Sequence, residues 1–376
     1  MEEKANQNPV QDYCFHTHTE RCKHAAKDTG DEEYVKNAIK GGIKTIAFTD
    51  HIPMPEGLNN RPNSRMDMDE FEPYIKSIEN LKRTYEGQII IESGVEFEFA
   101  EEYKGVNYLQ YLQGIREKTD KMVLGQHWII DRDGKKIDIG REKEDEEISS
   151  SILDEYVESI CNAIKNDLPD IIAHPDLFMK ARNKFGPEEK AATRKICEEA
   201  IKNGIPLEIN FGLISKYNDL SKSDIDDFEE VSYPSKEFWE YVAQISPFYE
   251  EKYGQKLKVL FGKDAHSPLQ LSTEKDLEIA IRIIGIETLE KLHFVKEDLK
   301  TIDTQMSEKL KRYKDREDKK TETEEQEKMA SQRKIVFFRQ RKIGTPIMME
   351  AKEQMLLDLN EMTKLKIEDC FEQKEA

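Results

Sequence analysis

Short apolar runs alternate with longer amphipathic stretches from about Tyr13 onward, and this alternation constrains the fold more than any other feature. The apolar runs have the length of buried strands, and the amphipathic stretches have the length and periodicity of helices. Such alternation is typical of βα units that build a mostly parallel sheet. Strands are predicted at 12–18, 43–50, 88–98, 121–129, 170–175, 205–211 and 257–264. Helices are predicted at 31–41 (after a capping box of Thr29 and Glu32), 69–86, 105–119, 151–166, 187–203, 234–252 and 273–285.

Seven strands, each followed by a helix, predict a closed (β/α) barrel of roughly 250 residues. The chain has 376 residues, so we expect a barrel domain over residues 1–300 and a further segment over 301–376. In that segment the alternation stops, and Lys309 to Arg333 is a run of mixed charges with few apolar residues. We expect a charged linker or helix there, followed by a C-terminal helical extension that packs or forms a homo-oligomer.

Two polar segments between the predicted elements are unusually long, at 52–68 and 131–150. The second is rich in Asp, Lys and Glu. Loops of this length in a compact barrel are often lids or binding loops. We therefore expect both segments to act in one of these ways.

The charge of the chain argues against a nucleic-acid partner. Its net charge of −19 arises entirely in residues 1–300, where 41 basic residues face 60 acidic ones, and so acidic a body repels polyanions. No apolar run approaches the roughly 20 residues that span a bilayer, and the N-terminal sequence lacks the order of a signal peptide. We therefore expect a cytoplasmic protein with no membrane partner, whose five scattered cysteines are reduced thiols.

Seven of the eight histidines lie at or just beyond the end of a predicted strand. They are His16, His18, His24, His51, His127, His174 and His266, and the eighth is His293. The carboxyl ends of barrel strands converge on one face, where residues far apart in sequence become neighbours. We therefore expect the seven imidazoles to surround one pocket.

Two pairs of candidate ligands have the spacing of residues on one side of a strand. His16 and His18 are two residues apart, as are Asp264 and His266, so each pair points in one direction. Imidazoles and carboxylates are ligands that suit zinc, iron or manganese. The joint placement of these residues at strand ends predicts a multinuclear metal centre.

A carboxylate is needed to bridge adjacent ions and to offset their charge. The run Gly94-Val95-Glu96-Phe97-Glu98 at the end of the third predicted strand supplies two candidates. Glu96 is the predicted bridging ligand. Glu98 is expected to support the ligands from behind or to belong to a lid.

These residues resemble the polymerase and histidinol phosphatase (PHP) superfamily, specifically its histidinol-phosphatase branch, over roughly residues 12–290. The resemblance rests on motifs that occur in the family's order and spacing: Phe15-His16-Thr17-His18-Thr19, Cys22-Lys23-His24, Phe48-Thr49-Asp50-His51, Gly94-Val95-Glu96, Gly125-Gln126-His127, Ala173-His174-Pro175-Asp176-Leu177, Glu208-Ile209-Asn210 and Gly262-Lys263-Asp264-Ala265-His266.

The resemblance implies an α/β fold, a distorted (β/α)7 barrel, that holds three divalent ions of zinc, manganese or iron. The implied ligands are His16, His18, Glu96 and Asp264 for the first ion, Glu96, His127 and His174 for the second, and His24, His51 and His266 for the third. The implied chemistry is hydrolysis of a phosphomonoester by a metal-bridging hydroxide that Glu96 and Asp264 hold in place.

The residues that contact the substrate are less clearly marked. The family places an arginine after the Glu-Ile-Asn strand to hold phosphate, but this chain reads Phe211-Gly212-Leu213-Ile214-Ser215-Lys216 there. Lys216 is a candidate replacement that acts as a point charge. Further candidates, each with an ordinary surface charge as the alternative, are Arg182, Lys263, Arg61 and Arg65. Asp50 and Asp176 are candidates for orienting ligand imidazoles, or are ordinary strand-end carboxylates.

The leading hypothesis is a metal-dependent phosphatase that converts L-histidinol phosphate and water to histidinol and phosphate in histidine biosynthesis. One alternative is a PHP phosphoesterase that acts on another small phosphorylated metabolite or on nucleotide ends. An alternative of another class is a metal-stabilised scaffold or regulator that binds a partner through the C-terminal extension.

Overall fold

A computed structural model of the chain describes residues 11–55, 58, 63–140, 147–182, 184–217, 232–271, 276–295, 311, 314 and 315. The chain divides into two compact units, Met1–Leu310 and Lys311–Ala376. Nearly all of the second unit lies outside the described residues. The predicted boundary at residue 300 and the charged helical extension therefore stay predictions, and the fold below is that of the first unit.

A parallel sheet forms the centre of the first unit. Within the described residues it has eight strands in the order β1-β2-β3-β6-β9-β10-β11-β12, and every neighbouring pair is parallel. These strands are β1 (Tyr13–Cys14), β2 (Thr45–Phe48), β3 (Ile90–Phe97), β6 (Lys121–Leu124), β9 (Ile171–Ile172), β10 (Leu207–Asn210), β11 (Lys258–Gly262) and β12 (His293–Phe294). Most of their residues are buried, as expected of a parallel sheet covered on both faces.

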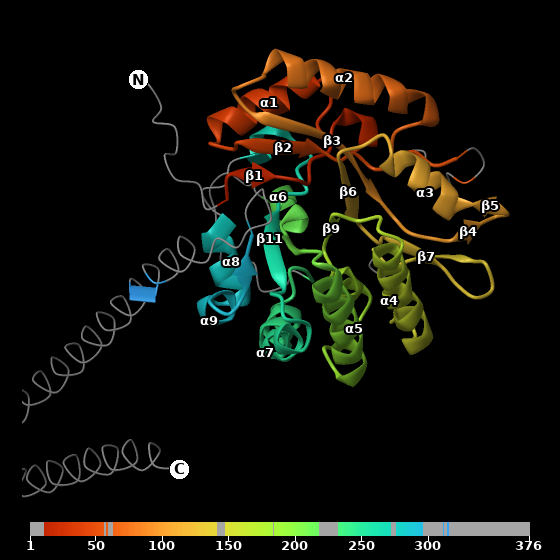
Figure 1. Cartoon of the computed structure of the whole chain (residues 1–376), viewed down its shortest axis with the longest axis vertical. Coiled ribbons are helices and arrows are strands. Elements are labelled where there is room, and N and C mark those ends of the chain that lie inside the picture. The colour runs from red at the N-terminus through yellow and green to blue at the C-terminus, as the bar shows by residue number, and fades with distance from the viewer. Residues whose placement is uncertain are drawn as a thin grey trace, which may run out of the picture. The chain divides into compact units, whose positions relative to one another are not determined.

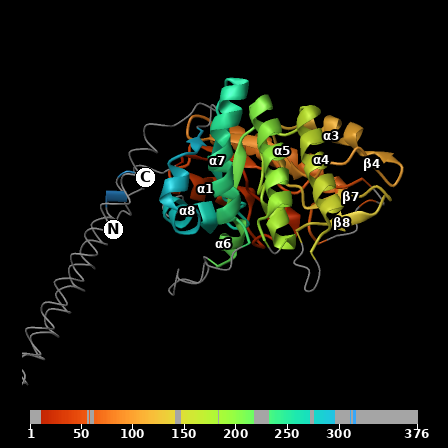
Figure 2. The ribbon, with the colours of Figure 1, turned by 90° about the horizontal axis from the view of Figure 1, so that it is seen from below.

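Helices lie around the outside of this sheet (Figure 1). The described helices are α1 (Asp31–Lys40), α2 (Phe71–Thr84), α3 (Tyr108–Arg116), α4 (Ser150–Lys165), α5 (Pro187–Asn203), α6 (Gly212–Tyr217), α7 (Lys236–Tyr253), α8 (Asp276–Ile284) and α9 (Ile286–Leu289). Figure 2 shows α4, α5 and α7 side by side, and α5 packs against both neighbours. None of the described helices is long and apolar enough to cross a membrane.

The carboxyl end of the barrel closes where the chain after β1 meets the chain after β11. Thr17 and Ala265 form a parallel bridge at this seam. The backbone N–H of His18 donates to Ala265 O at 2.7 Å, and the N–H of Ala265 donates to His16 O at 3.1 Å. The bridge therefore brings residues that flank candidate ligands on both strands into register.

A glutamine side chain completes the seam at its other end. Gln11 is buried, its Nε2 donates to Phe261 O at 2.8 Å, and its Oε1 accepts from Phe261 N at 3.0 Å. Gln11 thus makes both of the hydrogen bonds that a strand residue would make with β11. This pairing compensates for the short β1, which has two residues.

An apolar cluster fills the barrel interior, and its residues lie in the strands of the sheet or just beyond their ends. Its members are Tyr13, Phe15, Ala47, Val123, Ile171, Ala173, Leu260 and Val295, all at most 2% exposed. The hydroxyl of Tyr13 also donates to Val295 O, which ties the first strand to the chain after β12. Because apolar side chains fill the interior, the polar side chains of the site are expected at the ends of the strands.

The predicted fold class is confirmed. Each of the seven predicted strands and seven predicted helices contains an element of the expected type, and the parallel sheet curls into a distorted barrel. An eighth strand, β12, was not predicted. It places His293 at the amino end of a strand, where His293 Nε2 lies 3.2 Å from Glu250 Oε1. His293 is therefore separate from the other seven histidines, as the sequence indicated.

Two further predictions were wrong in detail. The helix α1 begins after Gly30 without a side-chain cap, because Thr29 donates its hydroxyl to Lys27 O instead. Acidic residues in its first turn interact favourably with the positive end of the helix dipole, and they stabilise the start of the helix without a capping box. The segment 131–150 is not loop throughout, because it contains β8 (Lys136–Asp138), which forms an antiparallel hairpin with β7 (Trp128–Ile130). A second antiparallel hairpin, of β4 (Glu102–Tyr103) and β5 (Val106–Asn107), lies earlier in the chain.

We expect Gln11→Ala to lower the free energy of unfolding by about 1–3 kcal/mol, because the buried N–H and C=O of Phe261 lose their partners. Urea denaturation followed by circular dichroism measures the change. Gln113→Ala, on the exposed face of α3, is the matched control and should change stability by less than about 0.5 kcal/mol. Equal effects of the two substitutions would contradict the role given to Gln11.

Candidate metal centre

The seven strand-end histidines and two carboxylates meet at the carboxyl end of the barrel. His16 and His18 follow β1, His51 follows β2, His127 follows β6, His174 follows β9, and Asp264 and His266 follow β11. His24 follows the short 3-10 turn η1 (Glu20–Cys22), and Glu96 lies within β3. The sequence prediction of a single pocket agrees with this arrangement.

Glu96 lies at the centre of the cluster and is 1% exposed. Both of its carboxylate oxygens face imidazole nitrogens. The distances from Oε1 are 3.1 Å to His174 Nε2, 3.4 Å to His16 Nε2 and 3.6 Å to His127 Nε2, and those from Oε2 are 2.8 Å to His51 Nδ1 and 3.4 Å to His18 Nε2. Burial alone would raise the pKa of Glu96, but the surrounding imidazoles, His51 and His127 above all, hold it well below its usual value.

Asp264 faces the same pocket from β11. Its Oδ1 lies 3.1 Å from His18 Nε2 and 3.6 Å from His16 Nε2. His16 and His18 therefore lie between two carboxylates, Glu96 and Asp264, which come from opposite sides of the barrel seam. Both imidazoles thus point to the same side of the strand, as their spacing predicted, and their role as ligands stays a prediction.

Three imidazoles gather at the other end of the pocket, where His51 Nδ1 lies 2.8 Å from Glu96 Oε2 and His266 Nδ1 lies 3.5 Å from Asp264 Oδ1. His24, His51 and His266 each place one ligand nitrogen within 4.8 Å of the other two, and His24 Nε2 lies 2.9 Å from His266 Nε2. His24 is exposed and the side chain of His266 is 19% exposed, whereas Glu96 and His18 are buried. This end of the pocket is therefore the one that faces solvent.

The residues fit divalent metal ions. Among the described residues, five groups satisfy the distance requirement for a shared ion. Three of them are His16 with His18 and Asp264, Glu96 with His127 and His174, and His24 with His51 and His266. The other two are His18 with His51 and Glu96, and His18 with Cys22 and His266. His16 Nε2, His18 Nε2 and Glu96 Oε2 are buried and have no hydrogen-bond partner among the described residues. Buried polar atoms are normally paired, so lone pairs gathered in this way favour a cation.

Three glycines leave the space that the buried carboxylates occupy. A Cβ atom on Gly125 would lie 1.9 Å from Glu96 Oε1, and one on Gly262 would lie 1.7 Å from Glu208 Oε1. A Cβ atom on Gly212 would lie 2.3 Å from Asp264 Oδ2. Each glycine thus lies against a carboxylate from a neighbouring strand, and any larger residue would displace it.

Two of the candidate ligands have strained backbones. His174 has a φ of 29° and Asp264 a φ of 46°, in the left-handed region that residues with a side chain seldom adopt. Each is the second residue after the end of a strand, so the left-handed conformation turns the chain and its side chain into the pocket. Such strain, of order 1–3 kcal/mol per residue, is typically concentrated at functional sites.

Two carboxylates orient imidazole rings by contacting their Nδ1 atoms. His16 donates from Nδ1 to Glu208 Oε1 at 2.9 Å, and His127 Nδ1 lies 3.2 Å from Glu98 Oε1. Bonds of this kind fix the ring tautomer and leave the other nitrogen free to bind an ion. Glu98 has the supporting role predicted for it. Glu208 was missed, although it belongs to a motif that the sequence singled out, because its contact with His16 joins residues 192 positions apart.

Asp50 and Asp176 do not have the imidazole contacts proposed for them. Asp50 accepts from the backbone and hydroxyl of Thr19, and burial raises the pKa of its carboxyl to about 7. Asp176 accepts from the backbone N–H of Ser235. Both carboxylates therefore anchor loops at the edge of the pocket.

The basic candidates for phosphate binding differ in their surroundings. Arg65 is buried and forms a bidentate pair with Glu98, and Arg182 donates to Glu188, Glu189 and the backbone of Ile148. Both guanidinium groups are thus paired within the protein, and a phosphate contact stays a prediction for each. Lys263 is 8% exposed and directly precedes Asp264. Arg61 and the side chain of Lys216 lie outside the described residues.

Tyr233 borders the pocket and was not anticipated from the sequence. Its ring centroid lies 5.9 Å from that of His174, and the residue is 7% exposed. Burial raises the pKa of its hydroxyl well above the usual value, and the nearby carboxylate of Asp264 adds to the effect. The residue follows a polar segment without strand or helix periodicity, so no sequence signal pointed to it.

Comparisons with known proteins agree with this geometry. The family model described as the PHP domain matches residues 15–211, more than half of the chain. The chain is 28% identical to the histidinol-phosphatase of Bacillus subtilis (strain 168) over 212 residues, which are 52% of this chain and 78% of that protein. It is 33% identical over 85 residues to the probable histidinol-phosphatase of Deinococcus radiodurans, 22% of this chain and 31% of that protein.

A solved structure has a similar fold. The crystal structure of a Listeria monocytogenes protein, assigned as a histidinol phosphatase, superposes with a TM-score of 0.52. The superposition covers 70% of this chain and 99% of the other, at 18% sequence identity. At that identity the likeness supports the barrel fold and carries no further conclusion.

We expect Gly125→Ala to weaken divalent-metal binding by about 10–100-fold, because the added methyl group displaces the Glu96 carboxylate. Isothermal titration calorimetry with Mn²⁺ measures the affinity. Gly114→Ala is the matched control, since a Cβ atom there meets nothing within 4 Å. The control should bind Mn²⁺ normally and gain up to about 1 kcal/mol of stability from its helical position. Normal binding by both variants would argue against the central position of Glu96.

We expect Glu208→Gln to weaken Mn²⁺ binding by about 10–100-fold as well, because the amide no longer stabilises the His16 ring as a carboxylate does. Equilibrium dialysis with metal analysis gives the stoichiometry and affinity. Glu251→Gln, an exposed change on α7 with the same loss of charge, should leave both unchanged. If the two variants bind alike, the contact with His16 is incidental.

Proposed function

Because the chain belongs to the PHP family, we propose that it is a metal-dependent phosphomonoesterase whose substrate is L-histidinol phosphate. The products are then histidinol and inorganic phosphate. The similarity to histidinol-phosphatases supports the substrate, and the site supports the reaction class. This substrate makes histidine biosynthesis the corresponding pathway.

The observation that carries the proposal is the convergence of seven imidazoles and two carboxylates on one pocket. We assign His16, His18, Glu96 and Asp264 to a first ion, Glu96, His127 and His174 to a second, and His24, His51 and His266 to a third. The distances within each group are compatible with this assignment. Glu96 would contribute to both of the first two groups, since it lies near His16 and His18 of the first and near His127 and His174 of the second.

Divalent ions in such a centre supply Lewis acidity, which activates water near neutral pH and offsets charge on the phosphoryl oxygens. The residues of the chain fix where this happens. Glu208 and Glu98 hold the His16 and His127 rings in one tautomer. The pair of Arg65 with Glu98 keeps that carboxylate ionised, although burial alone would raise its pKa. The pocket is thus preorganised before a substrate arrives.

The substrate is held by groups outside the ligand sets. We retain Lys263 as a phosphate contact, because it directly precedes Asp264 at the strand end that enters the pocket. The buried Tyr233 ring closes the side of the pocket next to His174. A phosphate ester with a cationic leaving group suits the acidic surroundings, since residues 1–300 have an excess of 19 acidic over basic residues.

The changed phosphate-binding segment favours a second candidate, another small phosphate monoester. The residues after β10 read Phe211-Gly212-Leu213-Ile214, without the arginine of the family, and α6 begins at Gly212. A lysine or a loop donor in place of that arginine would accept leaving groups of other shapes. A scaffold without turnover is not favoured by any contact in the pocket.

Phosphate release from a substrate panel tests the proposal. We expect the protein reconstituted with Mn²⁺ or Zn²⁺ to hydrolyse L-histidinol phosphate with a higher kcat/KM than sugar or nucleotide phosphates. His16→Ala should lower this value by more than about a hundredfold, because the substitution removes a ligand of the first ion. Preference for another ester would move the protein to the second candidate. Absence of turnover with every ester would refute a phosphatase.

A further inference from the structure

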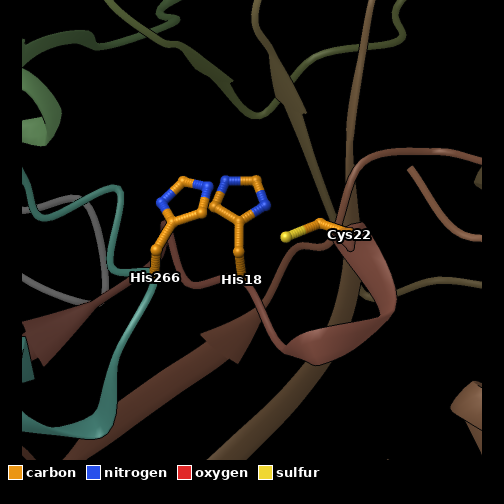
Figure 3. A group of neighbouring side chains, drawn as sticks. All are labelled: His18, Cys22 and His266. Carbon is orange, nitrogen blue, oxygen red and sulfur yellow. The ribbon is translucent and has the colours of Figure 1, made fainter. Parts of the chain in front are cut away.

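Cys22 places a sulfur atom beside the imidazoles at the solvent-facing end of the pocket. One ligand atom each from His18, Cys22 and His266 lies within 4.8 Å of the other two. Figure 3 shows the Cys22 sulfur directed toward the ring of His18, with His266 on the far side of that ring. The ligand sets assigned above do not use this sulfur.

The two nitrogens of His18 have different surroundings. Nε2 lies 3.1 Å from Asp264 Oδ1 and 3.4 Å from Glu96 Oε2, on the carboxylate side of the ring. Nδ1 is the nitrogen on the Cys22 side in Figure 3. It is buried and has no hydrogen-bond partner among the described residues, while the residue as a whole is 0% exposed. Nδ1 is therefore an unpaired buried nitrogen beside the Cys22 sulfur.

The ligand chemistry of this space differs from that around Glu96. The buried end of the pocket includes the carboxylates of Glu96 and Asp264 beside its imidazoles, and oxygen ligands suit harder ions such as Mn²⁺ or Mg²⁺. Two imidazoles and a thiolate instead suit Zn²⁺ and softer ions such as Cd²⁺. Two of these three ligands are fixed by burial, whereas the His266 side chain is 19% exposed and has room to turn toward an ion.

We propose that Cys22, His18 and His266 form a sulfur-containing site for a thiophilic divalent ion of the Zn²⁺ and Cd²⁺ class. Binding forms one metal–sulfur bond, the thiol proton passes to solvent, and no electron is transferred. Exposed His24, whose Nε2 lies 2.9 Å from His266 Nε2, is placed to supply a fourth ligand. An ion at this site takes His18 through Nδ1, so it competes with any ion that takes the same ring through Nε2.

The inference extends the proposed metal centre, and it depends on the metals alone, not on the identity of the phosphate ester. Its test therefore measures bound metal and not phosphate release. A failure here leaves the phosphatase proposal intact, and an inactive protein could still show the sulfur site.

The test is titration of the chelator-treated full chain with Cd²⁺ and, separately, with Mn²⁺. Wild-type protein should develop an ultraviolet sulfur-to-metal charge-transfer band that saturates at a single Cd²⁺ ion per chain. The ¹¹³Cd NMR signal of the same sample should lie in the range of mixed nitrogen and sulfur coordination. Both readouts use the wild-type chain, so they do not depend on how any variant folds. Absence of the band and of the NMR signal would overturn the proposal.

Serine substitutions identify the sulfur. Cys22→Ser should abolish the band and weaken Cd²⁺ binding at least about tenfold, while Mn²⁺ binding changes less than about twofold. Cys14→Ser and Cys161→Ser should keep the band, because Cys14 Sγ contacts the backbone of His16 and the hydroxyl of Thr17, and Cys161 Sγ contacts Lys195 O. A band that survives Cys22→Ser, or an equal loss of Cd²⁺ and Mn²⁺ affinity, would show that Cys22 only packs against the ligands.

Discussion

A buried carboxylate among imidazoles is the constraint on which the rest of the pocket depends. Glu96 is 1% exposed, and its charge would be costly in such a place without compensating positive groups. The imidazoles supply part of the compensation, and the assigned ions would supply the remainder. The space for the carboxylate comes from Gly125, which follows the neighbouring strand β6. The carboxylates of Glu208 and Glu98 then hold two of the facing rings in place.

The sequence predicted the elements and the ligand positions for a physical reason. Strands buried on both faces are nearly continuous apolar runs, and polar residues that end such runs stand out clearly. His51 after Phe48 and His174 after Ile172 are examples of this pattern. Since parallel strand ends meet on one face, the position of each histidine in the chain was enough to predict a shared pocket.

The contacts behind the ligands could not be predicted in this way. Which carboxylate supports His16 depends on how β10 lies beside β11, because Gly262 must leave room for Glu208. The same limit applies to Arg65. It lies in a polar segment of the sequence, yet its side chain is 4% exposed and paired with Glu98. Sequence patterns report periodicity, whereas these pairs depend on the packing of distant segments.

Ions held at the barrel seam would stabilise the fold in addition to any chemical role. His16 and His18 lie on one side of the seam and Asp264 on the other, where backbone hydrogen bonds join His16 and His18 to Ala265. Any ion held by all three acts as a removable cross-link between the beginning and the end of the barrel. Folding and metal loading are then thermodynamically linked: an ion at a thousand times its Kd would contribute about 4 kcal/mol to closure. Loss of such ions would then leave the barrel, through the same contacts, closer to opening.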